Sequence, residues 1–101
     1  MIARIWRTAV DSRRAGAYED FARAVSLPMF RQQQSYAGVI MGHSGHSCIV
    51  MTLRHSMIDV GVLDHLHMYK NTVQQILTKG ILLGEQTTET LEAHTLDVSA
   101  G

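Results

Sequence analysis

The sequence has little of what marks secreted and membrane proteins. It contains one cysteine, Cys48, so no disulfide can form within the chain, and an oxidising compartment is not indicated. No apolar run approaches the ~20 residues that a membrane-spanning helix needs, and the first ten residues lack the apolar core of a signal peptide. These absences predict a cytoplasmic protein with no membrane partner.

The sequence also lacks an excess of charge and the common catalytic motifs. Nine Lys and Arg balance nine Asp and Glu, which gives no electrostatic attraction for nucleic acid. No Ser–His–acid arrangement, phosphate-binding glycine loop or dinucleotide fingerprint is present. The 101 residues therefore predict a single domain, 1–101, with no nucleic-acid partner and no cofactor.

The first half of the chain predicts a strand, a helix and a β-hairpin. Residues 2–10 alternate as a strand does, and a helix is expected from a cap at residues 11–12 to about Val25. The single proline, Pro28, should end or kink that helix, and a short helical turn is expected to resume at residues 29–33. Two strands are expected at 36–43 and 46–54.

The loop between these two strands decides which side chains share a face of the sheet. We expect a two-residue loop at Ser44 and Gly45, with His43 facing His46 across the strands. Both faces of the hairpin are then apolar. One face carries Ala37, Val39, Met41, Cys48, Val50 and Thr52, and the other carries Tyr36, Gly38, Ile40, Ile49, Met51 and Leu53. A longer loop would change this assignment.

The second half predicts a helix and a last strand. A capping-box pattern at Ser56–Asp59 opens a helical region whose second half runs from Tyr69 to about Lys79, with Gly80 as its C-cap. Residues 89–98 alternate like a strand. The order β-α-β-β-α-β predicts a ferredoxin-like α+β fold, an antiparallel sheet with both helices on one face.

Two helices can cover only one face of such a sheet. Leaving the other apolar face in water would forfeit several kcal/mol at ~25 cal/mol per Å². The simplest solution is a second copy of the chain packed against that face. We therefore predict a homodimer.

The segment Gly42–Cys48, GHSGHSC, holds ligand types that zinc and copper prefer. His43 and His46 as cross-strand partners would supply two of the ~four ligands that a structural zinc needs, and Cys48 lies further inward. No second pair of ligands is visible elsewhere in the sequence. We therefore expect no metal site, and expect Cys48 to be a small core residue.

Several segments together resemble one protein family. MIARIWR (1–7), AYEDFA (17–22), YAGVIM (36–41), IVMTLRHSMID (49–59) and the segment 69–98 look like the antibiotic biosynthesis monooxygenase-like family. The resemblance covers nearly the whole chain and implies a dimeric α+β barrel. That family includes cofactor-free oxygenases of aromatic polyketides, haem-degrading enzymes, isomerase-like and cyclase-like relatives, and members with no assigned reaction.

The chain also departs from the family's patterns. Where the family often has a W-x-S sequence, this chain has Arg54–Ser56, so the resemblance does not extend to the family's aromatic-lined entrance. The haem-degrading branch uses an asparagine, a tryptophan and a histidine at positions that fall about at Trp6, Leu63 and Val73. None of the three matches, which argues against haem degradation.

Two residues of the first strand are candidates for substrate binding. In the family, the position of Trp6 faces a pocket between the sheet and the helices, so Trp6 is either a stacking wall for a flat apolar substrate or a core aromatic. Arg4 lies on the same strand face. Its guanidinium would bind a carboxylate or enolate, or pair with an acidic residue at the dimer interface.

The second helical region and the end of the third strand supply the other candidates. His65 or His67 would act as general base on an acidic phenol, because the pKa of histidine, ~6.5, suits that role. Residues two apart on a helix point in different directions, so at most one of them faces inward. Tyr69 would orient a substrate hydroxyl, and Arg54 is either solvated or a substrate contact near the entrance.

Two functions follow as hypotheses. The first is a cofactor-independent monooxygenase, or related small enzyme, acting on a hydrophobic aromatic or polyketide-like molecule. The second is a non-catalytic dimeric protein that binds a small apolar ligand or serves in a stress response.

Overall fold

The computed structural model describes residues 1–33, 36–55 and 67–99. The elements in chain order are β1 (Ile2–Val10), a 3₁₀ turn η1 (Ser12–Arg14), α1 (Ala15–Phe21), a π-helical turn η2 (Ala22–Ser26), α2 (Leu27–Arg31), β2 (Gly38–Ser44), β3 (Ser47–Arg54), α4 (His67–Thr78) and β4 (Leu82–Glu92). The predicted capping box at Ser56–Asp59 lies outside the described residues.

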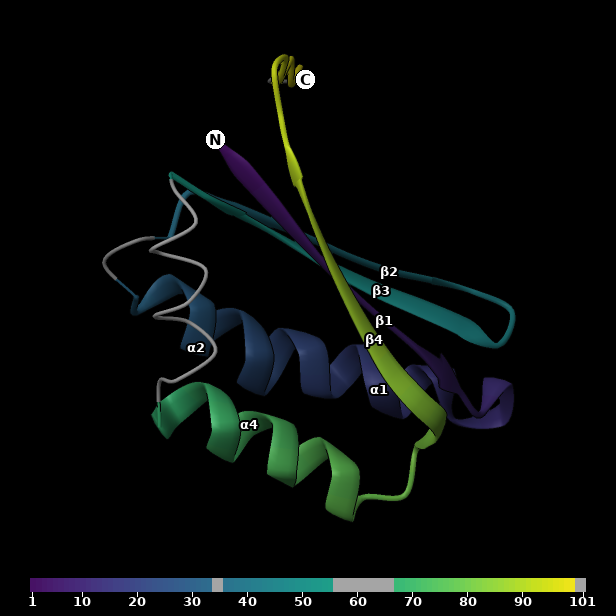
Figure 1. Cartoon of the computed structure of the whole chain (residues 1–101). Coiled ribbons are helices and arrows are strands. Elements are labelled where there is room, and N and C mark those ends of the chain that lie inside the picture. The colour runs from purple at the N-terminus through teal and green to yellow at the C-terminus, as the bar shows by residue number, and fades with distance from the viewer. Residues whose placement is uncertain (34–35, 56–66, 100–101) are drawn as a thin grey trace.

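One antiparallel sheet holds all four strands, in the order β2-β3-β1-β4. The helices α1, α2 and α4 lie on the same side of this sheet (Figure 1). The α+β, ferredoxin-like architecture predicted from the sequence is therefore confirmed. No helix within the described residues is long and apolar enough to cross a membrane.

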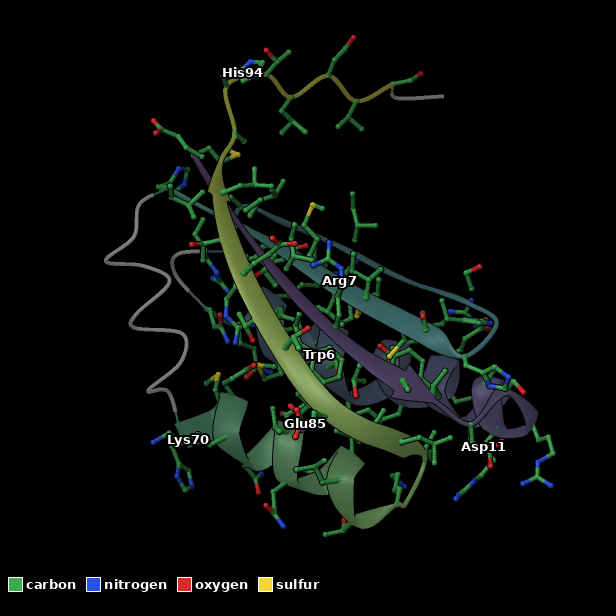
Figure 2. The ribbon with its side chains drawn as sticks, turned by 45° about the vertical axis from the view of Figure 1, so that its right-hand side comes forward. Trp6, Arg7, Asp11, Lys70, Glu85 and His94 are labelled. Carbon is green, nitrogen blue, oxygen red and sulfur yellow. The ribbon has the colours of Figure 1, made fainter. Side chains whose placement is uncertain are left out.

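The two faces of the sheet follow from the alternation of side chains along β1 and β3. The inner face, which the helices cover, carries Arg4, Trp6, Thr8, Cys48, Val50 and Thr52, and the outer face carries Ala3, Ile5, Arg7, Ile49, Met51 and Leu53. Trp6 and Arg7 point to opposite sides of β1 (Figure 2). The hydrophobic core lies between the inner face and the helices.

The first helical region passes Pro28 without the break that the sequence predicts. It does not end near Val25 but continues through η2 and α2 to Arg31. Pro28 lies in the first turn of α2, where it lacks an N–H and its ring crowds the carbonyl of Ala24, four residues earlier. The π-helical turn directly before α2 accommodates this crowding, so the helix passes the proline.

The two-residue hairpin turn lies one residue later in the chain than predicted, at Gly45 and His46. Ser44 pairs with Ser47, and His43 pairs with Cys48 rather than with His46. Gly45 has a φ of 57°, which suits the first central position of a type II′ turn, whereas the sequence-based loop placed this glycine second. Each residue of one strand therefore pairs with a residue two positions from the predicted one. Since side chains alternate with a period of two, the predicted membership of the two faces is unchanged.

The last strand begins and ends earlier in the chain than the sequence predicts. β4 begins at Leu82 and ends at Glu92, whereas the sequence predicted 89–98. After Leu82 and Leu83 its first half is polar, and it contains Gly84, whose φ of 77° accompanies a shift in the pairing of β4 with β1. The pairing with β1 stabilises this half as a strand despite its polar composition. The segment after β4 extends away from the sheet (Figure 1).

Candidate functional site

A small cavity lies between the inner face of the sheet and the helices. Its volume is about 50 Å³. Its lining comes from the sheet, from the first helical region and from α4: Arg4, Trp6, Val50, Tyr18, Phe21, Ser26, Met29, Phe30, Tyr69, Thr72, Val73 and Ile76. Most of these side chains are apolar or aromatic, so the cavity suits the apolar part of an organic molecule.

Arg4 is the charged residue of this lining, and it is only 5% exposed. Its Nη2 donates a hydrogen bond of 2.9 Å to the hydroxyl of Tyr69, and its guanidinium lies 5.2 Å from the centroid of the Tyr69 ring. The second contact has the geometry of a cation–π interaction. These two contacts join β1 to α4.

Trp6 lines the same cavity as Arg4 and is hydrogen-bonded to a residue of β4. Its indole Nε1 donates a hydrogen bond of 2.9 Å to Oε1 of Gln86. Gln86 follows Gly84, where the pairing of β4 with β1 shifts, and the hydroxyl of Thr8 donates to the carbonyl of Glu85 at 3.2 Å. Trp6 is therefore both a core aromatic and a wall of the cavity, which were alternatives in the sequence.

Sequence reasoning missed Gln86. A glutamine in a polar stretch carries no signal of its own, and the positive φ of Gly84 becomes visible only in the structure. The glycine two residues before it was the one available hint, since an isolated glycine in a strand often marks a bulge.

A second hollow lies on the other side of Arg4, Trp6 and Tyr69. This outer cleft, between α4 and β4, has a volume of about 250 Å³. Besides those three residues it is lined by Lys70, Val73, Gln86 and Thr88. Figure 2 shows Trp6 between β4 and the helix layer, with Lys70 on α4. The cavity and the outer cleft share part of their walls and form one candidate site.

Arg54 is not solvated and does not line the cavity. It is 0% exposed, and its Nη2 donates a close hydrogen bond to Oε1 of Gln33. Nε2 of Gln33 lies 3.1 Å from the sulfur of Met29 and donates a hydrogen bond to it. This arrangement links the end of β3 to α2, which is a structural contact. A role for Arg54 in substrate binding stays a prediction.

Of the two predicted histidine bases, His67 lies within the described residues. His67 is the exposed first residue of α4 and is not part of the described lining of the cavity or of the outer cleft. His65 lies outside the described residues. The assignment of either histidine as general base therefore stays a prediction.

Cys48 is buried beneath α1, where it contacts the hydroxyl of Tyr18. Burial raises the pKa of the Cys48 thiol, and burial next to Cys48 raises the pKa of the Tyr18 phenol above its usual value. A nucleophilic cysteine needs the opposite shift. Cys48 is therefore a core residue, as the sequence indicated.

The histidines of the hairpin do not join a metal-binding group. Among the described residues, no three His, Cys, Asp or Glu side chains gather as metal ligands would. Nδ1 of His43 lies 3.4 Å from a carboxylate oxygen of Glu19 on α1, which links the hairpin to the helix layer.

The chain matches no family model, and no curated protein sequence matches it. Solved structures do resemble it. NE2512, a protein of unknown function from Nitrosomonas europaea, is 14% identical, with 99% of this chain and 95% of that chain covered and a TM-score of 0.78.

Two further neighbours are described as monooxygenases. An antibiotic biosynthesis monooxygenase is 9% identical, with 94% of this chain and 100% of that chain covered and a TM-score of 0.73. The monooxygenase from the gene ActVA-Orf6 of Streptomyces coelicolor, in complex with the ligand nanaomycin D, is 11% identical, with 98% and 92% covered and a TM-score of 0.76. These likenesses span nearly the whole chain, and they show that it has the fold of antibiotic biosynthesis monooxygenase-like proteins.

Proposed function

We propose that this protein is a small cofactor-independent monooxygenase whose substrate is a flat, hydrophobic aromatic molecule with an acidic oxygen. The observation that carries the proposal is that Arg4, Trp6 and Tyr69 converge on one apolar cavity. Trp6 provides a surface for stacking, Arg4 a positive charge for an enolate or phenolate, and Tyr69 a hydroxyl beside it. The neighbour in complex with nanaomycin D supports a small organic ligand.

In the proposed reaction, Arg4 favours the deprotonated form of the substrate because an adjacent positive charge lowers the pKa of a phenol or enol. The resulting anion carries negative charge on a ring carbon, which reacts with dioxygen. One oxygen atom enters the product and the other leaves as water, so that a CH₂ group becomes a C=O group. The apolar lining excludes water from the reactive anion. His65 or His67 remains our proposal for the proton acceptor.

A non-catalytic ligand-binding protein is the second candidate. The size of the cavity favours it, because about 50 Å³ holds a few water molecules and is smaller than the ~150 Å³ cavity that accommodates benzene. In this alternative, the protein holds an apolar group at Trp6 without turning it over.

We also propose that the protein acts as a homodimer in which the outer faces of two sheets meet. Ile40 on β2 and Leu91 on β4 lie on that face and are 60% and 46% exposed, with Met51 between them partly exposed. No helix of the described residues covers this side of the sheet (Figure 1). Covering an apolar surface of this kind is favourable in proportion to its area.

Oxygen uptake with a panel of tricyclic phenols tests the enzyme hypothesis. We expect oxygen uptake to depend on the protein. The change Arg4→Met should lower kcat/KM about 100-fold or more, because it removes the positive charge beside the reacting anion. Arg13→Met is the matched control, since the side chain of Arg13 is 89% exposed near Asp11, far from the cavity. Binding without uptake would favour the second candidate, and an unaffected Arg4→Met variant would contradict the role of Arg4.

A further inference from the structure

The cavity alone is too small for the ligand class proposed above. Its volume of about 50 Å³ contrasts with about 250 Å³ for the outer cleft. Together the two reach the lower end of the ~300–1,000 Å³ that is usual for small-molecule sites. The ligand must therefore occupy both, with Arg4, Trp6 and Tyr69 at the boundary between them.

The two compartments differ in chemistry. The cavity is lined mainly by aromatic and aliphatic side chains. The described lining of the outer cleft contains two cations, Arg4 and Lys70, and no acidic residue. Lys70 is exposed on α4 and forms no ion pair with any described residue. Gln86 and Thr88 add polar groups from β4.

We infer that the outer cleft selects ligands that carry a permanent acidic group, with Lys70 as the residue that recognises it. The ring of such an amphipathic anion is too large for the cavity alone, so it lies across the boundary at Trp6, with one edge in the cavity and the rest in the outer cleft. Its carboxylate or similar group lies in the cleft between α4 and β4. This inference rests on the proposed function, since it concerns the same site, and it names a substrate class: aromatic acids rather than neutral aromatics.

Charge is the right basis for discrimination in this cleft. A neutral polar group would find hydrogen-bond partners in Gln86, Thr88 and Lys70, but it would gain no attraction between opposite charges. An anion gains a Coulomb attraction that is partly screened, because the cleft is open to solvent. The preference should therefore be moderate in size and should weaken as the salt concentration rises.

Naphthoate and its methyl ester are a matched pair of probes with the same ring and different charge. Trp6 is the sole tryptophan, so its fluorescence reports binding beside it, and calorimetry measures both affinities independently. We expect the wild-type protein to bind naphthoate about tenfold more tightly than the ester, since two cations line the cleft.

Two substitutions test the assignment of Lys70. Lys70→Gln should weaken naphthoate binding about fivefold and leave the ester unchanged, as expected for the loss of one exposed charge pair. Gln86→Glu retains an acceptor for the Trp6 indole but adds a negative charge to the cleft, so it should also weaken naphthoate alone. Lys79→Gln is the control, because it removes the same charge outside the outer cleft. Lys79 directly follows α4, at the end opposite Lys70, and its ammonium lies over the Phe21 ring.

Equal affinity for the two probes, an unaffected Lys70→Gln variant, or no binding of either probe would overturn the inference. Equal affinity would leave the proposed cavity intact, since both rings would still bind at Trp6. Conversely, an acid preference without oxygen uptake would uphold the inference and remove the enzyme hypothesis. The two proposals can thus fail separately.

Discussion

The inner face of the sheet buries several polar side chains, whereas the outer face leaves several apolar ones without a cover from the described helices. The inner face, beneath the helices, holds four polar or charged side chains that are buried: Arg4, Thr8, Thr52 and Arg54. The outer face, which no helix of the described residues covers, presents Ile40, Ile49, Met51 and Leu53. Burying polar groups costs free energy unless they are paired. Leaving apolar groups in water loses the free energy that their burial would contribute.

This difference is the reason why our proposal gives the two faces different roles. Of the four buried polar residues, Arg4 lines the cavity. A buried charge beside an apolar cavity is typical of a binding or catalytic site, where it provides orientation and charge. Apolar side chains on an uncovered sheet are typical of an interface. The inner face therefore carries the chemistry in our proposal, and the outer face carries the assembly.

The largest expected effect comes from placing a charge on the outer face. Met51 lies opposite Ile5 and Ile40 in the sheet. In the change Met51→Glu, each subunit would bury an unpaired carboxylate at the proposed interface, which should weaken dimerisation roughly 100-fold or more. Sedimentation velocity over a range of protein concentrations measures this.

Met68→Glu is the matched control for that experiment, because Met68 lies on α4 and is already 39% exposed. It should leave the association state unchanged. A wild-type protein that is monomeric at every concentration, or a Met51→Glu variant that still dimerises, would contradict the different roles of the two faces.

The next effect concerns the inner face and depends on pH. Because burial raises the pKa of Cys48, the folded protein retains the thiol proton at a pH where the unfolded chain loses it. Above the ordinary thiol pKa of ~8.5, rising pH therefore stabilises the unfolded state. The free energy of unfolding should fall by up to ~1.4 kcal/mol per pH unit from this group until the folded pKa is reached.

Urea unfolding of the wild type and of Cys48→Ala, compared between pH 7 and 9.5, isolates this contribution. The stability difference between the two proteins should shrink as pH rises, because the variant lacks the titrating thiol. Tyr18 of α1 also has a raised pKa, but its titration begins to matter only above the usual tyrosine pKa of ~10. A constant difference would indicate that Cys48 is not buried in the solution structure.

The smallest effect belongs to the ion pair of Arg7 and Glu89 on the outer face. Their side chains are 50% and 55% exposed, so solvent screens the attraction. A double-mutant cycle with Arg7→Met and Glu89→Gln in the monomeric Met51→Glu background should give a coupling of about 0.5 kcal/mol or less. A larger coupling in the wild-type background would indicate that dimerisation removes this pair from water.

The sequence was a good guide to part of the candidate site. Arg4 and Trp6 share a strand face by alternation, and the amphipathic stretch around Tyr69 places that residue on a helix above the sheet. These local periodicities brought three of the predicted residues to one cavity. Lys70 and Gln86 were not predicted, because nothing in their local sequence distinguishes them from solvated polar residues.

Alternation along the strands, helix periodicity and the glycine at the hairpin determined the element order, the α+β fold and the membership of the two faces. Even the misplaced turn did not disturb the faces, because a shift of two residues keeps every side chain on its side of the sheet. The sequence could determine these features because they depend on neighbours a few residues apart.

Only the tertiary structure decided the remaining features. The passage of the helix through Pro28 depends on a π-helical turn, the strand at Leu82–Thr88 depends on its pairing with β1, and the complete burial of Arg54 depends on Gln33. The hydrogen bond of Trp6 to Gln86 joins residues 80 positions apart. Contacts between such distant residues leave no periodic signal, because they follow from how whole elements pack rather than from any local pattern of residues.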